Sequence, residues 1–204
     1  MSNELEKIVN EEAAEAKPSF LKKYSENIAG ATSFIGSSIV LLNGGIESYV
    51  AAATFTAAEI TLAKWGNKTT GYSAGALLFG AGDAVLAFSN SVPDGSSLQY
   101  SLLTMTTAWG IGALRYPLER LAEYTHSKTM QAVADATQPI CGTVNLGLRV
   151  PGIAFAVHGG QYVLGTAISL WCVADVLAGR LQERVKSIGS YVKRQFSNYK
   201  QNSL

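Results

Sequence analysis

Five polar or charged side chains stand inside stretches of this chain that carry almost no other charge. They are Glu59, Asp83, Asn145, Arg149 and Asp175. An ionised group that is removed from water is strongly destabilised unless it meets a partner of opposite charge or a hydrated space. These residue types therefore point to one of two roles, either a buried contact that fixes helix packing or the lining of a path for a solute or an ion.

Asp83 and Arg149 each lie near the middle of an apolar stretch. Because they have opposite charges and similar depth, we expect them to come together. A bond between them would only hold helices in place, whereas an open polar space around them would make them a binding site for a solute or an ion. Asn145 adds a polar group to the stretch that contains Arg149.

Glu59 and Asp175 each precede a basic residue by five positions, namely Lys64 and Arg180. With a rise of about 1.5 Å per residue, a helix places both carboxylates roughly 7–8 Å inside the apolar stretch. Each side chain then has two alternatives. It reaches out to interfacial water or to the following basic residue, or it faces inward as one of a pair of functional acids.

The sequence contains no signal of enzymatic chemistry. It has no phosphate-binding loop, no dinucleotide-binding glycine pattern and no cysteine and histidine set with zinc spacing. No combination of serine, histidine and aspartate suits nucleophilic catalysis, and the net charge of +1 gives no indication of nucleic-acid binding. We therefore expect a protein that is not an enzyme and that has no catalytic residue, cofactor or metal site.

The elements that must position the five side chains are six predicted helices, at 27–43, 47–64, 70–90, 98–115, 138–157 and 160–179. Charged residues make up 15% of the chain, against roughly 25% in soluble domains. Turns with glycine separate the two helices of each consecutive pair. The sequence therefore predicts an all-α integral membrane protein with six transmembrane helices in three antiparallel hairpins. The alternative is a soluble bundle, but its helices should each carry a polar, charged stripe.

Fifteen of the sixteen Lys and Arg residues lie outside the apolar stretches, and all of them lie on one side of the predicted helices. None lies in the three hairpin turns, which contain Asn43, Asp94 and His158. Because short loops rich in Lys and Arg stay on the cytoplasmic side, we expect both termini to be cytoplasmic. The membrane would be a bacterial inner membrane or an organelle membrane.

The chain divides into an acidic cytoplasmic segment at 1–26, a transmembrane domain at 27–180 and a basic tail at 181–204. Apolar residues at helical spacing alternate with basic ones between 181 and 200. This pattern predicts an amphipathic helix on the anionic lipid of the inner leaflet, and a helix that continues straight into the cytoplasm is the alternative. A further short cytoplasmic helix is expected at 116–137.

The first and third predicted hairpins resemble each other in sequence. Ala58-Glu59-Ile60 aligns with Ala174-Asp175-Val176, and Trp109 of the second hairpin takes the place of Trp171 of the third. An internal repeat is one interpretation, and chance similarity between helices rich in Ala and Gly is the other. A true repeat of hairpins in one orientation predicts an axis along the membrane normal, with a transport site at the interface between repeats.

Two functions fit these observations. The favoured hypothesis is a small membrane transporter or channel for a polar or ionic solute, with a path between the hairpins past Asp83, Arg149, Asn145, Glu59 and Asp175. The alternative is a non-catalytic structural or assembly subunit of a larger membrane complex, which needs packing surfaces but no path. A homo-oligomer around a central pore is a third possibility. The direction in which Asp83 and Arg149 point distinguishes transport from a structural role.

Overall fold

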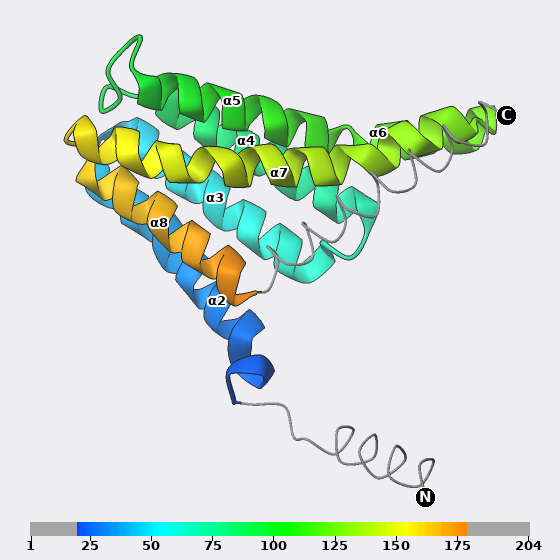
Figure 1. The fold of residues 1–204 in the computed structure, drawn as a ribbon, viewed down its shortest axis with the longest axis horizontal. Coiled ribbons are helices and arrows are strands. Elements are labelled where there is room, and N and C mark those ends of the chain that lie inside the picture. The colour runs from blue at the N-terminus through cyan, green and yellow to red at the C-terminus, as the bar shows by residue number, and fades with distance from the viewer. Residues whose placement is uncertain (1–19, 179–204) are drawn as a thin grey trace, which may run out of the picture.

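The computed structural model describes residues 20–178, and every element in that part of the chain is a helix (Figure 1). The elements are α2 (Phe20–Ile39), the short 3₁₀ helix η1 (Val40–Asn43), α3 (Gly45–Trp65), α4 (Thr69–Ala87), α5 (Ser97–Ala113), α6 (Arg115–Thr125), α7 (Lys128–His158) and α8 (Tyr162–Leu177). The prediction of an all-α protein is confirmed for these residues. The predicted amphipathic helix at 181–204 and most of the acidic segment at 1–26 lie outside the described residues.

The turns between the apolar helices lie where the sequence predicts them, because the chain has residues there that favour turns. Gly44, between η1 and α3, has a φ of 73°, and Gly160, between α7 and α8, has a φ of 74°. Glycine adopts such angles without the strain that a Cβ atom would cause. Ser96 begins α5 by accepting a hydrogen bond from the Gln99 backbone N–H at 3.1 Å, as helix-capping serines do.

The segment after α5 differs from the predicted short helix at 116–137. The chain forms α6, turns at His126 and then enters α7, which runs without a break for 31 residues. His126 has a left-handed backbone with a φ of 50°, and Ser127 accepts a hydrogen bond from the Met130 backbone N–H at 3.3 Å. The break lies at His126 because a capping side chain follows it, whereas α7 accommodates Pro139 in its interior.

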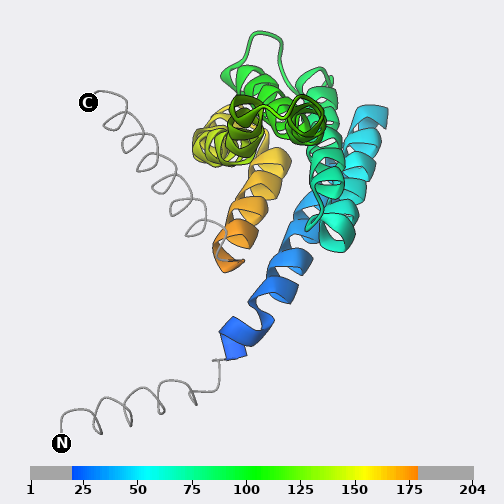
Figure 2. The ribbon, with the colours of Figure 1, turned by 90° about the vertical axis from the view of Figure 1, so that its right-hand side faces the viewer.

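Six of the described helices close into a ring around a central space. Each packs against two neighbours, in the order α2, α3, α4, α5, α7, α8 and back to α2. Seen from the end, α7 and α8 lie on one side of this helix ring and α3 and α4 on the other (Figure 2). The ring follows the order of the chain and is closed where α8 lies beside α2 (Figure 1). α6 lies outside it, mainly against α7.

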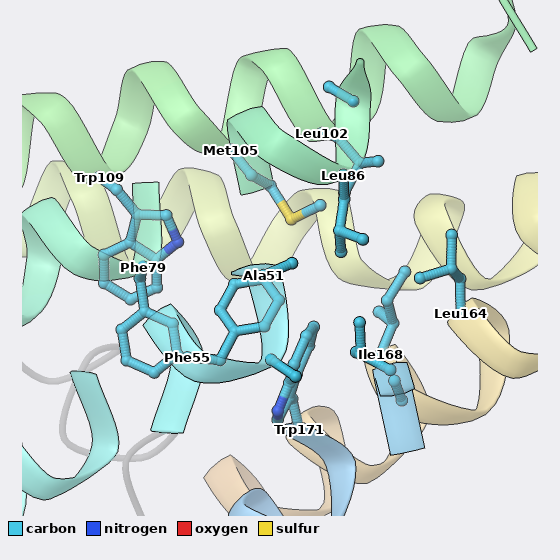
Figure 3. Close-up of a cluster of buried hydrophobic side chains, with 14 of the residues drawn as sticks. Ala51, Phe55, Phe79, Leu86, Leu102, Met105, Trp109, Leu164, Ile168 and Trp171 are labelled. Atoms are coloured by element: carbon cyan, nitrogen blue, oxygen red, sulfur yellow. The ribbon is translucent and has the colours of Figure 1, made fainter. Parts of the chain in front are cut away.

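Buried apolar side chains fill one end of the helix ring (Figure 3). Leu86 of α4, Leu102 of α5, and Leu164 and Ile168 of α8 are each at most 2% exposed. They lie close to the turns that join α4 to α5 and α7 to α8. We call these four residues the apolar seal, because they close the ring at this end.

A few charged side chains are buried inside the helix ring, and many large apolar side chains are exposed on its outside. Arg149 and Asp175 are buried, whereas Leu42 and Ile46 are each 75% exposed and Phe88 is 70% exposed. Large exposed apolar residues occur on every helix of the ring. The outer surface of the ring is therefore partly apolar, in addition to the apolar residues that are buried inside it.

One helix in the described part of the chain, α7, has both the length and the apolar composition needed to cross a membrane. Residues 27–43 and Tyr162–Leu177 are apolar but shorter. α4 has 19 residues, but its glycines, with Ser73 and Asp83, lower its mean hydropathy. In the described part of the chain, length and composition therefore identify one helix that could cross a membrane, whereas the positions of the turns predict six.

Candidate solute-binding cavity

A cavity of about 480 Å³ lies at the centre of the helix ring, and residues from all six helices of the ring line it. The lining combines acidic, basic, amide and aromatic side chains. The residues are Ser33, Glu59, Leu62, Gly66, Tyr72, Phe79, Trp109, Asp135, Gln138, Pro139, Gly142, Arg149, Trp171 and Asp175. This volume falls within the range of about 300–1,000 Å³ that small-molecule sites occupy.

The cavity runs from an exposed rim to a buried floor. At the rim, Asp135 and Gln138 of α7 are exposed, and Gly66 belongs to the turn between α3 and α4. At the floor, Arg149 and Asp175 are buried. The α3–α4 turn and the apolar seal lie at opposite ends of α4. The cavity therefore opens at the end of the ring that the seal does not close.

A buried ion pair joins α7 to α8 at the floor. Arg149 donates through Nη1 to the Asp175 carboxylate, and also to the backbone carbonyl of Trp171 at 3.3 Å. The side chains of Arg149 and Asp175 are 10% and 5% exposed. A buried pair of this kind depends on both charges, because removal of one leaves the other without compensation in a poorly hydrated place. The pair therefore fixes two charged groups on the cavity wall.

Arg149 forms its ion pair with Asp175 and not with Asp83, the partner that the sequence led us to expect. The helix ring explains the choice, since α8 is the neighbour of α7, whereas α5 separates α7 from α4. Asp83 is 3% exposed and does not line the cavity. Its carboxylate accepts a hydrogen bond from the Trp109 side chain and lies within range of the Arg149 charge. Asp83 thus supports the wall from behind.

Glu59 lines the cavity and makes a second polar contact between helices. Ser33 of α2, itself a lining residue, donates its hydroxyl to Oε1 of Glu59. Lys64, the outward alternative for Glu59, is exposed, and its Nζ lies 5.1 Å from the centroid of the Trp65 ring. Glu59 and Asp175 thus both face the cavity, and each accepts a hydrogen bond from the residue 26 positions before it.

Asn145 lies beside the cavity without being part of its lining. It is 1% exposed, and its amide N–H donates to the Cys141 carbonyl at 3.0 Å. Its Oδ1 atom has no hydrogen-bond partner within residues 20–178. Gly142 and Arg149, which do line the cavity, lie three residues before and four residues after Asn145 on α7. Helical geometry places such residues on one face, so Asn145 holds an acceptor next to the wall.

Four aromatic rings form a continuous series along one side of the cavity, from α5 through α4 and α3 to α8 (Figure 3). Phe79 and Trp109 stack with their centroids 4.9 Å apart. Phe55 meets Phe79 at 6.0 Å and Trp171 edge-on at 4.9 Å. Phe79, Trp109 and Trp171 line the cavity, and Phe55 is fully buried behind them. We call these four residues the aromatic wall.

The sequence did not indicate a role for the aromatic wall. Trp109 and Trp171 stood out only as equivalent positions in the predicted repeat. The available signal was the presence of such large rings in helices otherwise rich in small residues. Four further polar lining residues were also missed, namely Ser33, Tyr72, Asp135 and Gln138.

The entrance is bordered by Arg115. Its Nη1 donates to Oε1 of Gln138, and its guanidinium carbon lies 5.9 Å from the centroid of the Tyr72 ring. Nε of the same guanidinium pairs with Glu119 at 2.9 Å. The positive charge of Arg115 is therefore matched by the carboxylate of Glu119, which lies on the same helix, α6.

The cavity offers a solute carboxylates, a guanidinium, amide and hydroxyl groups, and aromatic rings. Between residues 20 and 178, no group of three His, Cys, Asp or Glu side chains is placed to hold a metal ion. Comparisons with family models, with curated proteins and with solved structures found no match to this chain. The geometry of the cavity is therefore the main guide to function.

Proposed function

We propose that the protein is a small integral membrane transporter that carries a polar or ionic solute through the centre of the helix ring. The observation that supports this function is a cavity of about 480 Å³ with Glu59, Arg149 and Asp175 on its wall. Ionised groups inside membrane helices are destabilising, and they mark paths for ions and solutes where they occur. Asp83 and Asn145 lie behind the wall and do not line the cavity, so the proposed path runs past the other three residues.

In this proposal, all six helices of the ring cross the membrane as the hairpins α2–α3, α4–α5 and α7–α8. The support comes from the exposed apolar side chains on each of these helices and from the charges buried between them. Lys64, Lys68 and Arg115 lie at the end of the ring where the cavity opens. The positive-inside rule assigns that end, together with both termini, to the cytoplasm.

The apolar seal favours a carrier over an open channel. Leu86, Leu102, Leu164 and Ile168 close the end of the ring opposite the cavity mouth. A solute that enters from the cytoplasmic side therefore meets a closed floor and needs a change of shape to leave on the other side. Carriers work by such alternating access around a fixed site near the bilayer midplane.

The test is solute permeation into liposomes that contain the purified full-length protein. Stopped-flow light scattering would follow shrinkage in hyperosmotic solution and reswelling as the solute enters. The separate solutes are tetramethylammonium thiocyanate, potassium thiocyanate, glycerol and glucose, and the membrane-permeant thiocyanate anion balances the charge of the cations. We expect protein-dependent reswelling with at least one of them. No reswelling with any solute would refute transport.

The path is tested with variants of its residues. Combined Arg149→Ala and Asp83→Ala substitutions should abolish reswelling, and Arg149→Gln with Asp175→Asn gives a second variant that keeps hydrogen bonding at the floor. Arg120→Ala is the matched control, because Arg120 is 63% exposed on α6, outside the ring. Reswelling at the wild-type rate in both double variants would show that solute permeation does not depend on these residues.

The competing proposal is a structural or assembly subunit of a larger membrane complex, and α6 favours it. This helix lies outside the ring, and its Tyr124 and Leu121 are 87% and 41% exposed. A partner bound there should copurify from the native membrane in mild detergent and be lost from a Tyr124→Ser variant. A partner lost in that variant, together with no permeation of any solute, would favour assembly over transport.

A further inference from the structure

We infer that the cavity binds a small organic cation, which carries an ammonium group on an apolar body. This inference rests on the transport function proposed above, because it names the class of solute that would be carried. It is drawn from the charge of the lining, from the aromatic wall and from the state of the one basic residue in the lining.

Among the residues that the structure describes, the lining has more acidic than basic side chains. Glu59, Asp135 and Asp175 contribute three carboxylates, and Arg149 contributes the one guanidinium among the lining residues. The charge of Arg149 is matched by Asp175 at the floor. Clefts lined by one sign of charge raise the local concentration of solutes of the opposite sign. The described lining therefore attracts cations.

The guanidinium of Arg149 is already engaged, which argues against an anionic solute. Its Nη1 donates to the Asp175 carboxylate and to the Trp171 carbonyl. An anion would have to compete with a buried carboxylate for this group. Arg115 at the entrance is likewise paired, with Glu119 at 2.9 Å.

The aromatic wall distinguishes an organic cation from a bare metal ion. The faces of aromatic rings attract cations within about 6 Å of the ring centroid, with tryptophan the strongest, and aromatic cages bind quaternary ammonium groups. Phe79, Trp109 and Trp171 contribute rings to the lining. A metal ion instead needs several ligating groups, and residues 20–178 contain no cluster of three such side chains.

The indole groups are held in place by contacts at their N–H edges. Nε1 of Trp171 donates to the Ser37 hydroxyl at 3.3 Å, and the Trp109 side chain donates to the buried carboxylate of Asp83. These contacts fix both rings before a ligand arrives, so little rotational freedom is lost on binding. The role of Asp83 in this site is to position Trp109.

The experiment compares three ligands that share a branched apolar frame and differ in charge, with the full-length protein in detergent. They are choline, its neutral isostere 3,3-dimethyl-1-butanol and the anion 3,3-dimethylbutyrate. Tryptophan fluorescence reports binding, in a Trp65→Phe background that leaves the two cavity tryptophans, Trp109 and Trp171, as the reporters. We expect choline to bind at least roughly tenfold more tightly than the other two ligands.

Matched variants test the charge and the rings separately. Glu59→Gln keeps an acceptor for the Ser33 hydroxyl and should weaken choline binding roughly fivefold without changing the affinity for the neutral alcohol. Glu47→Gln, the same change at the far end of α3, is the control. Asp135→Asn at the exposed rim should also weaken choline binding without disturbing the fold. Trp109→Leu should weaken it roughly tenfold, as followed by calorimetry.

The outcomes separate the inference from the transport function. Equal affinity for choline and the neutral alcohol, tighter binding of the anion, or no binding of choline at all would overturn the organic-cation assignment. In each of those cases, reswelling with another solute would leave transport in place. Selective choline binding that is weakened by Glu59→Gln, without permeation of any solute, would support the cation site and remove transport.

Discussion

Removing one member of the Arg149–Asp175 pair should destabilise the protein far more than removing both. Arg149→Met takes the guanidinium away from a carboxylate that is only 5% exposed. Breaking a buried pair in this way costs about 3–5 kcal/mol, whereas replacing both members by apolar residues of similar volume is neutral or stabilising by about 1–4 kcal/mol. We therefore expect the double variant Arg149→Met with Asp175→Leu to be at least as stable as the wild type.

The measurement is thermal unfolding of the four proteins of this cycle in one detergent. A change of 1 kcal/mol shifts the melting temperature of a chain of this length by roughly 2–4 °C. Each single variant should therefore melt roughly 6–20 °C below the wild type, and the double variant should not. The control is Arg120→Met, which breaks the exposed pair with Glu123 on α6 and should cost less than about 1 kcal/mol.

Additive effects of the two substitutions would refute this reasoning, because they would mean that the two groups do not stabilise each other. A stronger coupling of Arg149 to Asp83 than to Asp175, measured with Asp83→Asn in the same cycle, would contradict the helix order in the ring. Coupling to Asp175 with no loss of choline binding in the double variant would show that the pair stabilises the ring without being needed for the ligand.

Two further predictions concern packing and topology. A Cβ atom at Gly82 would lie 2.4 Å from the Phe55 ring, so Gly82→Ala should lower the stability measured by thermal unfolding by about 1–3 kcal/mol. Gly110→Ala is the control, because a Cβ atom there has no neighbour within 4 Å and should not destabilise the protein. Equal melting temperatures of the two variants would mean that the aromatic wall moves aside. In sealed vesicles of a variant without the native cysteines, an impermeant maleimide should label Asp94→Cys and Lys68→Cys from opposite sides of the membrane, and labelling from the same side would contradict six crossing helices.

Local sequence signals predicted the helices and turns well. Glycines with left-handed angles act within a few residues of themselves, so Gly44, Gly95 and Gly160 mark turns without knowledge of the rest of the chain. The length of α7 was missed because the prediction ended one helix at 137 and began another at 138, next to Pro139. A proline removes one hydrogen bond from a helix but does not always end it, and Ser127 provides the stronger start signal.

The composition of the site was harder to predict because it depends on which helices are neighbours. The similar depth of Asp83 and Arg149 along their helices led us to expect that they form a pair. Depth does not predict the order in which the helices follow one another around the ring. α5 stands between their helices, and α8 brings Asp175 to Arg149 instead. The aromatic wall was invisible for the same reason, since its rings come from four separate helices that meet only in three dimensions.

The polar contacts of the first and third hairpins suggest how the charge of the cavity arose. Glu59 aligns with Asp175 in the predicted repeat, and each accepts a hydrogen bond from the residue 26 positions earlier. Ser33 and Arg149 thus have the same role as hydrogen-bond donors to the two aligned acids. In this interpretation both hairpins keep the acidic residue. Its hydrogen-bond donor is a neutral serine in the first hairpin and a positively charged arginine in the third.

The difference between the two donors can be tested by making them alike. Ser33→Arg would place a guanidinium beside Glu59, in a position that lines the cavity and has room for a longer side chain. The added positive charge should form a second buried pair and reduce choline binding by more than Glu59→Gln does, because it also repels the ligand. Ser38→Arg, on the exposed side of the same helix, is the control. If choline bound Ser33→Arg as tightly as the wild type, the carboxylate of Glu59 would not be the group that attracts the cation.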